Sequence, residues 1–414
     1  MSQDSAPENP TAPYQPYQDA IPPENAPISS ANGTLISPDE RDKELLQDST
    51  RADRAATPEP DEAHIEFPPG LPTPPFIHVE GIPNFRDLGG YQCQPPPSAS
   101  SSDGKVYQLR KGILYRCAHP THLTPQGLET LTQRLGVTTL FDLRSQPEIT
   151  RLAGNVATSP KSLYPLADPS TGTIGSHPST PGLTRRFTPV YQTEDYGPVA
   201  LARKLQWYTA THDAQHSTLG FSYSEGFVHA YRDIAAHGAS AYASIFQHIL
   251  EHGEASPLAF HCAAGKDRTG VFGALIMRLV GVDEDTICWE YALTEPGLGR
   301  WREQFIQRIS RSGLGGGGSK LSSEEKTPSD KNAVSREEAA RICGSRAGNM
   351  RAWLDTVLDG EFGGVDRYLT EKCGLTTEQI DRLRTILSVP VPDGHEVTRR
   401  SEIAGWTPEG GVQD

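Results

Sequence analysis

The pattern of hydrophobic and polar positions changes at about residue 76. Before that point apolar residues show no sustained period, and residues 1–75 are rich in Pro, Ser, Asp and Glu. Such a segment cannot bury enough apolar surface to offset the entropy lost on ordering, so we predict a disordered, Pro-rich tail over residues 1–75. Its motifs PYQPYQ and FPPGLPTPP offer an alternative to a purely solvated tail, namely docking to an SH3- or WW-type partner.

From residue 76 onward, short apolar runs alternate with helical patterns. KGILYRCA (111–118) and TTLFDLRS (138–145) predict buried strands. Between them LTPQGLETLTQRLG predicts a helix with Thr124 as its cap and Pro125 at its first position. This alternation of strand, helix and strand predicts an α/β fold with a central, mostly parallel sheet flanked by helices.

Three later segments extend this pattern. Residues 225–251 have helical spacing, with apolar positions at Ile234, Tyr242, Ile245, Phe246, Ile249 and Leu250. SPLAFHC (256–262) predicts a short strand, and RTGVFGALIMRLVGV (268–282) predicts an apolar helix after it. Residues 335–387 predict further helices with a turn at Gly374.

Composition marks the borders of the folded part. Residues 153–220 hold many Gly, Pro, Ser and Thr, which predicts a long excursion around the core or a flap over an active site. Residues 312–332 contain four consecutive glycines and predict a flexible insertion. We therefore predict one domain over residues 76–390 and a second disordered tail over 391–414.

The bulk numbers exclude several classes of function. A net charge of −14 argues against broad binding of nucleic acid or anionic membrane. No apolar run approaches the roughly 20 residues of a transmembrane helix, and the start of the chain lacks the pattern of a secretory signal. The six cysteines are scattered without CxxC pairs, which predicts reduced thiols and a cytoplasmic or nuclear location. No His/Asp/Glu cluster has the spacing of a metal site, and we expect neither metal nor cofactor.

The segment that carries chemistry is HCAAGKDRTG, between the predicted strand and the apolar helix. A loop there directs successive backbone N–H groups at one point, and the helix N-terminus adds positive potential, which together form an anion-binding nest. Arg268 lies six positions after Cys262, where its guanidinium can bind two phosphate oxygens. The expected phosphate-binding residues are Ala263, Ala264, Gly265, Lys266, Thr269 and Gly270.

The same positive field favours the thiolate form of Cys262 and makes it the expected nucleophile. His261 is expected to hold the loop through a backbone hydrogen bond, and Thr269 can donate its hydroxyl to the sulfur. A buried cysteine after a core strand would explain Cys262 alone. It would not explain a glycine, an arginine and a Thr-Gly pair at these offsets. All six fixed positions together (His, Cys, Gly, Arg, Thr and Gly) arise by chance in on the order of one chain in a million.

This segment resembles the signature loop of protein-tyrosine phosphatases, and most closely that of the bacterial-type and fungal tyrosine phosphatase family, HCxAGKDRTG. Other pieces are similar to that family in the same order: NFRDLGGY (84–91), ILYRCAHPTHLT (113–124), FDLRS (141–145) and FGGVDRYLTEKCGLTTEQIDRLR (362–384). The resemblance covers most of residues 76–390. It implies a cysteine-phosphatase fold and hydrolysis of phosphate monoesters through a phosphocysteine intermediate.

A general acid is needed to protonate the leaving oxygen. The sequence has no Trp-Pro-Asp tripeptide, and Asp168 and Asp195 are loosely placed alternatives that fit ordinary loop residues. The family resemblance implies that Asp267, within the loop itself, serves as the acid. Asp142 on the FDLRS strand is the second candidate, and its alternative role is to orient an arginine or cap the backbone.

Lys266 bears on the substrate. An extra positive charge at the loop suits multiply phosphorylated headgroups, and members of the resembled family accept phosphotyrosine and, in some cases, phosphoserine or phosphoinositides. We therefore expect protein phosphotyrosine as the leading substrate class with relaxed specificity, and phosphoinositides as the alternative. A solvated Lys266 at the pocket rim is the neutral interpretation of that residue.

Three further alternatives stay open. A non-catalytic phosphate-binding pseudophosphatase would share the loop, as would an enzyme of sulfur transfer or arsenate reduction. The intact nucleophile, arginine and acid candidate disfavour the pseudophosphatase, and the Arg-Thr-Gly ending of the loop disfavours sulfur transfer and arsenate reduction.

Cys117 replaces the serine usual in the family and could trap an oxidised Cys262 as a disulfide, or simply be a small buried thiol.

Overall fold

The computed structural model describes residues 67–99, 104–149, 163–165, 175, 177–180, 182–191, 221–312 and 335–412. All of them belong to one unit, Ala56–Asp414. Residues 1–66 of the predicted Pro-rich tail and residues 313–332 of the predicted insertion lie outside the described residues. Residues 67–75, also predicted as disordered tail, are packed instead: Leu71 is buried in a hydrophobic core, and the Pro75 carbonyl accepts from the Asp87 N–H at 3.0 Å. Within the described part of the chain, no helix is long and apolar enough to span a membrane.

The predicted α/β sheet is confirmed. Its strands lie in the order β1-β4-β8-β5-β7-β6, with β4, β8, β5 and β7 parallel and the two edge strands antiparallel. The bounds are β1 Arg86–Asp87, β4 Leu114–Cys117, β5 Thr139–Asp142, β6 His177–Thr180, β7 Leu183–Phe187 and β8 Leu258–His261. Every residue of β4, β5 and β8 is buried, as expected for central strands covered on both faces.

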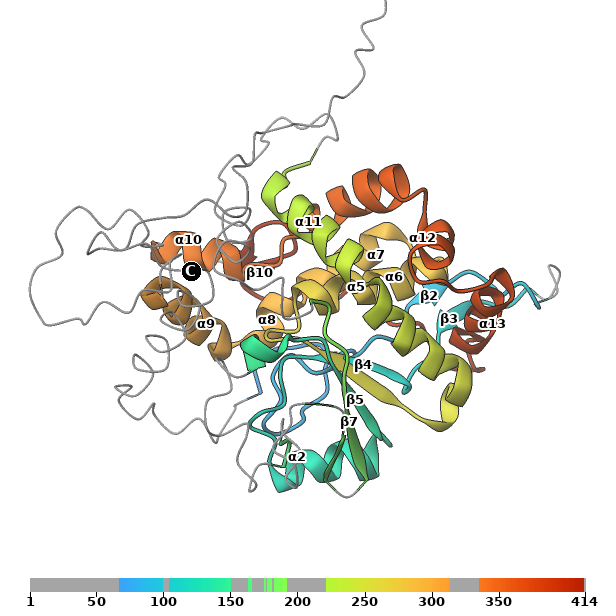
Figure 1. The fold of residues 1–414 in the computed structure, drawn as a ribbon, viewed down its shortest axis with the longest axis horizontal. Helices are drawn as coiled ribbons and strands as arrows, with labels where there is room; N and C mark the ends of the chain where they lie inside the picture. The colour runs from blue at the N-terminus through green and yellow to red at the C-terminus, as the bar shows by residue number, and fades with distance from the viewer. Residues whose placement is uncertain are drawn as a thin grey trace, which may run out of the picture. The chain divides into compact units, whose positions relative to one another are not determined.

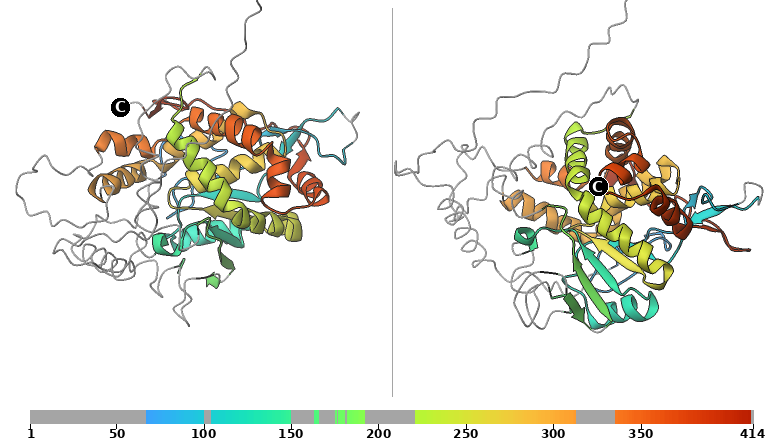
Figure 2. Two further views of the ribbon diagram at one scale, coloured as in Figure 1. Left: turned by 45° about the horizontal axis from the view of Figure 1, so that its top comes forward. Right: turned by 45° about the vertical axis from the view of Figure 1, so that its right-hand side comes forward.

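Helices cover both faces of this sheet (Figures 1 and 2). Successive strand residues alternate between two cores: Phe260 packs with the larger cluster and Ala259 with the smaller one. The larger core contains residues of α5 Glu225–His252, α6 Asp267–Leu279, α7 Glu284–Ala292, α11 Ala347–Trp353, η5 Leu354–Glu361, α12 Val365–Glu371 and α13 Thr377–Leu387. The smaller core contains residues near α2 Pro125–Glu129 and its continuation η2 Thr130–Arg134.

The predicted helices form for the reasons given by their sequences. The Thr124 hydroxyl accepts a hydrogen bond of 3.1 Å from the backbone N–H of Gly127 and caps α2. The predicted turn between α12 and α13 lies at Gly374, whose φ of +71° is accessible mainly to glycine. α5 has all six predicted apolar positions buried.

The smaller elements complete the fold. β2 Gln92–Cys93, β3 Tyr107–Leu109 and β9 Ser388–Pro390 form an antiparallel sheet, and η4 Gly253–Ala255 follows α5. α8 Thr294–Leu298 leads to α9 Arg300–Ser312, and α9 packs against α10 Arg336–Cys343 through Ile306, Ala339 and Ile342. The predicted insertion therefore lies between two helices that touch.

Two later segments also differ from the sequence-based expectation. Residues 391–412, predicted as a disordered tail, contain a hairpin of β10 Trp406–Thr407 and β11 Gly411–Val412. The Trp406 side chain joins the larger core. The backbone N–H of Ala347 donates to the Pro408 carbonyl at 2.8 Å, which ties this segment to α11. Within residues 153–220, β6 and β7 extend the sheet, whereas most of the predicted flap lies outside the described residues.

Candidate active site

Three strand ends meet in one row beside the candidate nucleophile. His261 at the end of β8 pairs in parallel register with Cys117 of β4 on one side and Asp142 of β5 on the other. Cys262 follows at once, and α6 begins at Asp267, so residues 262–268, called here the Cys262 loop, join strand to helix. The Cys262 side chain is 2% exposed. In parallel sheets this carboxyl edge is where ligands bind.

The carbonyls of the Cys262 loop are held by the surrounding protein. The Cys262 carbonyl lies 3.1 Å from His261 Nδ1, and the Ala263 carbonyl accepts from the His119 backbone N–H at 3.0 Å. The Ala264 carbonyl accepts from Asn84 Nδ2 at 3.1 Å, and the Gly265 carbonyl accepts from Arg116 Nη2 at 2.8 Å. The Lys266 carbonyl accepts from the Gly270 N–H at 2.7 Å. In a trans peptide unit the N–H points away from the carbonyl, so each carbonyl held by protein turns the following N–H away from that donor.

Gly265 is required by space as well as by conformation. Its φ is +68°, and a Cβ atom there would lie 2.3 Å from the Cys117 carbonyl oxygen. That approach is shorter than any real contact of a Cβ atom, and the clash is with backbone that cannot rotate away. The glycine therefore lets the loop lie against β4.

Arg268 is held by a carboxylate that the sequence analysis did not single out. Its two terminal nitrogens each lie 2.6 Å from an oxygen of Glu148, and both side chains are 11% exposed. Burial opposes ionisation of Glu148, but the Arg268 guanidinium outweighs it and sets the pKa of this carboxyl below its usual value. Glu148 and Ser145 also exchange backbone-to-side-chain bonds of 3.4 Å, so the capping-box pattern Ser-x-x-Glu was the available sequence signal.

His261 has the backbone hydrogen bond expected for it and a second contact that was not expected. Burial lowers its pKa to about 4, so the ring is neutral at physiological pH. Since a carbonyl can only accept, Nδ1 carries the hydrogen toward the Cys262 carbonyl, and Nε2 accepts from the Tyr164 hydroxyl at 2.9 Å. Nothing in the Gly- and Pro-rich sequence around Tyr164 signalled this role.

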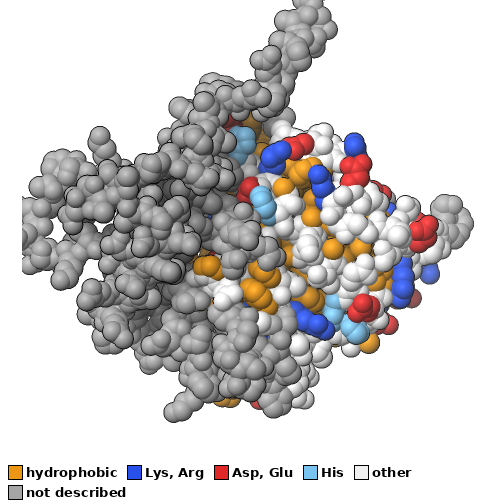
Figure 3. Space-filling view, in the orientation of Figure 1, with side chains coloured by type: hydrophobic (Ala, Val, Ile, Leu, Met, Phe, Trp, Pro, Cys, Tyr) orange, Lys and Arg blue, Asp and Glu red, His pale blue; other side chains and the backbone are white. Residues whose placement is uncertain are grey.

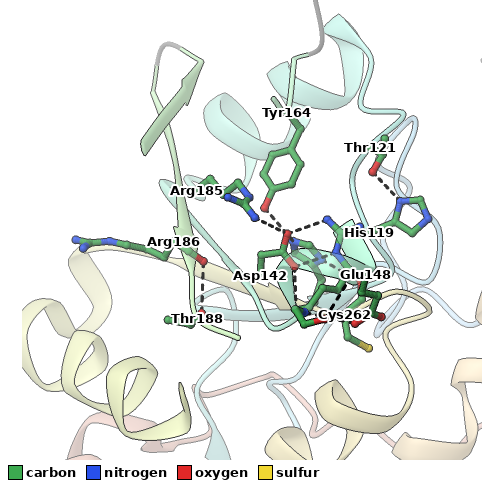
Figure 4. Close-up of polar contacts among 12 residues, drawn as sticks. His119, Thr121, Asp142, Glu148, Tyr164, Arg185, Arg186, Thr188 and Cys262 are labelled. Atoms are coloured by element: carbon green, nitrogen blue, oxygen red, sulfur yellow. Dashed lines mark hydrogen bonds and ion pairs between the residues drawn. The ribbon is translucent and has the colours of Figure 1, made fainter. Parts of the chain in front are cut away.

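Asp142 lies at the centre of a buried ionic cluster (Figure 4). Arg144 binds both of its carboxylate oxygens, at 2.9 and 2.8 Å, and Arg185 of β7 adds a bond of 3.0 Å. Burial would raise the pKa of Asp142, but the arginines reverse this and hold it well below the usual range. A carboxylate held in this way has no proton to give, so the geometry disagrees with Asp142 as an acid and agrees with its alternative role of orienting arginines.

A second buried cluster lies on the other side of the loop. Glu290 of α7 accepts from Arg86 Nε at 2.6 Å and from Arg116 Nη1 at 2.5 Å, and all three side chains are buried. Arg116 is the residue that also holds the Gly265 carbonyl. Both arginines lie in motifs quoted for the family resemblance, whereas no local pattern marked Glu290.

Lys266 and Asp267 differ in their exposure to solvent. Lys266 is 4% exposed, its ammonium donates to the carbonyls of Ile342 and Gly344 at 2.5 and 3.1 Å, and it lies 4.8 Å from the centre of the Phe227 ring. The solvated-rim interpretation of Lys266 is therefore wrong. Asp267, 26% exposed, lies 3.4 Å from the Lys266 ammonium.

The remaining predicted residues are placed as follows. Thr269 is buried, and its hydroxyl has no hydrogen-bond partner in the structure, so the expected bond to the Cys262 sulfur is not formed in this state. Cys117 is a buried free thiol whose pKa is raised by burial, and Cys262 is also a free thiol. Asp168 and Asp195 lie outside the described residues.

Comparison with known proteins shows the family of this chain. A model of the tyrosine phosphatase family matches residues 77–389. The chain is 25% identical over 287 residues to the triple specificity protein phosphatase PtpB of Mycobacterium tuberculosis, which covers 67% of this chain and 92% of PtpB. It is 25% identical over 304 residues to a putative tyrosine-protein phosphatase of Cupriavidus necator, a match that covers 73% of this chain and 86% of that protein. It is 28% identical over 166 residues to a tyrosine-protein phosphatase of Nostoc commune, a match that covers 40% of this chain and 50% of that protein. The chain therefore belongs to the tyrosine phosphatase family and is a phosphoric monoester hydrolase.

Proposed function

We propose that the Cys262 loop hydrolyses phosphotyrosine on proteins, with relaxed specificity, through a phosphocysteine at Cys262. The observation that carries this proposal is that the carbonyls of residues 262–266 are each held by a protein donor, which fixes the conformation of the loop. Backbone N–H groups left by such a loop, together with Arg268, suit the three equatorial oxygens of a phosphoryl group in transfer.

The proposed reaction has two steps. The Cys262 thiolate attacks phosphorus, the bond to the leaving oxygen breaks, and Asp267 gives its proton to that oxygen. The Asp267 carboxylate then takes a proton from water, the water oxygen attacks phosphorus, and the S–P bond breaks to regenerate the thiolate and release phosphate. Glu148 fixes the plane of the Arg268 guanidinium during both steps.

Charge around the loop supports binding of a dianionic phosphate. The ion-paired cations there are Arg86, Arg116, Arg144, Arg185, Lys266 and Arg268. In the state that begins the proposed reaction, with Asp267 protonated, they face the carboxylates of Asp142, Glu148 and Glu290 and the Cys262 thiolate, which gives a formal charge of +2. The whole chain carries −14. On the face drawn in Figure 3, acidic and basic side chains of the described residues lie interspersed. Local field is thus positive in an acidic protein.

The acid assignment has its own test. Asp267 stands at the first position of α6 beside the loop, whereas the arginines hold Asp142 in its ionised form. Replacing Asp267 by Asn should remove one limb of the pH–rate profile. An unchanged profile would refute Asp267 as the acid.

Substrate range is the part of the proposal that rests most on relatives. PtpB is named a triple specificity phosphatase, which supports relaxed specificity here. Burial of the Lys266 ammonium against the carbonyls of Ile342 and Gly344, at the end of α10, argues against its direct contact with a lipid headgroup. Turnover of phosphotyrosine peptides, phosphoserine peptides and phosphoinositides should be measured side by side, and a clear preference for phosphoinositides would favour the alternative.

The non-catalytic alternative is tested in one assay. The protein should hydrolyse p-nitrophenyl phosphate, and the variant Cys262→Ser should not. Binding of phosphate without turnover by the wild-type protein would favour a pseudophosphatase. Docking of residues 1–75 to an SH3- or WW-type domain, and a cytoplasmic or nuclear location, remain separate proposals, tested by pull-down with isolated domains and by microscopy of a tagged chain.

A further inference from the structure

A chain of buried tyrosines leads to Asp267. The Tyr231 hydroxyl, on α5, donates to Asp267 Oδ1 at 3.0 Å. The same hydroxyl is hydrogen-bonded to the hydroxyl of Tyr291 on α7, and the two rings pack edge to face at 5.9 Å. Both tyrosine side chains are buried, whereas Asp267 is partly exposed. Three helices thus converge on one carboxyl group beside the Cys262 loop.

The direction of the hydrogen bonds follows from the chemistry of the groups. A tyrosine hydroxyl has one hydrogen, and that of Tyr231 is given to Asp267, so Tyr291 must donate to Tyr231. Burial raises the pKa of Tyr291 well above its usual value, which keeps it a neutral donor. The chain therefore runs from Tyr291 through Tyr231 to the carboxyl group.

Both contacts to the Asp267 carboxyl group reach the same oxygen. Oδ1 accepts from Tyr231 and lies 3.4 Å from the Lys266 ammonium. If a proton resides on Oδ2, Oδ1 is a carbonyl oxygen and still accepts from Tyr231; if the proton leaves, Oδ1 is a carboxylate oxygen and accepts as well. The tyrosine contact is thus compatible with Asp267 both as acid and as base.

We propose that Tyr231, supported by Tyr291, is a positioning residue that holds Asp267 by Oδ1 and leaves Oδ2 to exchange the proton with the leaving group and with water. This inference rests on the proposed function, in which Asp267 is the general acid. Its physical basis is that proton transfer requires the carboxyl oxygen within hydrogen-bond reach of the leaving oxygen, and the Tyr231 hydrogen bond restricts the orientation of a partly exposed carboxyl group.

The variant Tyr231→Phe tests this with little change in packing, because the ring contacts with Phe227 and Tyr291 remain. Turnover should be compared on phenyl phosphate, whose leaving group needs a proton, and on difluoromethylumbelliferyl phosphate, whose leaving group hardly does. We expect kcat on phenyl phosphate to fall about tenfold, a part of the roughly 10²–10⁴ that general acids supply, and kcat on the activated ester to stay within about twofold. Tyr291→Phe should show a smaller loss of the same kind.

Tyr368→Phe is the matched control. Its hydroxyl is also buried and donates to the Ala235 carbonyl at 2.7 Å, but it does not contact the Cys262 loop. This variant should lose stability without dependence on the leaving group. Thermal unfolding and vanadate affinity of all variants establish that each is folded and that its loop binds an oxyanion.

The variant Asp267→Asn distinguishes a failure of the proposed acid role of Asp267 from a failure of the positioning role of Tyr231. If it loses activity mainly on phenyl phosphate and Tyr231→Phe shows the same selectivity on a smaller scale, the inference is supported. If only the Asp267 variant is selective, and Tyr231→Phe loses nothing or loses equally on both esters, the positioning role is overturned while the acid stands. If Asp267→Asn itself is not selective, the proposed acid fails and the inference with it.

Discussion

The buried cluster around Glu290 allows a quantitative prediction. Glu290 is 1% exposed and is the shared counter-charge of two buried guanidinium groups, those of Arg86 and Arg116, at 2.6 and 2.5 Å. Glu290→Gln keeps the shape of the side chain but removes its charge, so two cations are left in the core without a counter-charge. Breaking a buried pair in this way costs about 3–5 kcal/mol. That is a large part of the roughly 5–15 kcal/mol that stabilises a typical folded protein.

The control is a surface glutamate that pairs with an arginine at similar distances. Glu361 accepts from Arg232 at 2.6 and 2.7 Å, but the two side chains are 41% and 51% exposed. Glu361→Gln should therefore cost no more than about 1 kcal/mol. Urea unfolding of both variants, followed by circular dichroism, measures the free energy of unfolding of each. Equal losses for the two variants would refute the argument that burial sets the cost.

The same experiment has a predicted pH dependence. The arginines lower the pKa of Glu290 below its usual value of 4.5 in the folded protein, although burial alone would raise it. A carboxylate with a depressed folded pKa stabilises the fold fully above its unfolded pKa and loses that contribution as the pH falls through the folded pKa. The difference in free energy between wild type and Glu290→Gln should thus be constant above about pH 5 and shrink below pH 4.5. A difference that grows on acidification would contradict the assignment.

Further predictions concern the loop and its neighbours. Arg268→Lys should lower kcat/KM for p-nitrophenyl phosphate by about 10² or more, because an ammonium cannot bind two oxygens in a fork, and Glu148→Gln should lower it by about tenfold. Gly265→Ala should abolish turnover, because its Cβ would clash with backbone at 2.3 Å. Gly374→Ala, with a similar φ of +71° and nothing within 4 Å of the new Cβ, should cost only about 1 kcal/mol of unfolding free energy and no activity. After mild peroxide treatment, mass spectrometry should find no disulfide between Cys117 and the nucleophile, since the buried thiol of Cys117 has a raised pKa and is a poor attacking group; detection of that link would reverse this view.

Local patterns in the sequence were enough to predict the class of the fold and to single out Cys262 and Arg268. An apolar strand, a Cys-to-Arg spacing of six and an apolar helix all lie within residues 256–282. The cap at Thr124 and the turn at Gly374 are equally local, because backbone geometry and the nearest hydrogen bonds decide them. Such features can be predicted from a single sequence, because no distant segment is needed to specify them.

Only the tertiary structure decided which partners surround the loop. Arg268 meets Glu148 across 120 positions of sequence, and Arg86 meets Glu290 across 204. Side chains of this kind look like ordinary surface charges in a sequence, because ion pairing leaves no periodic pattern and a lone buried charge is too costly to expect. Register in the sheet brought Asp142 beside His261, and the arginines around Asp142 lower the pKa of its carboxyl. Asp267, in contrast, lies beside tyrosines from two other helices.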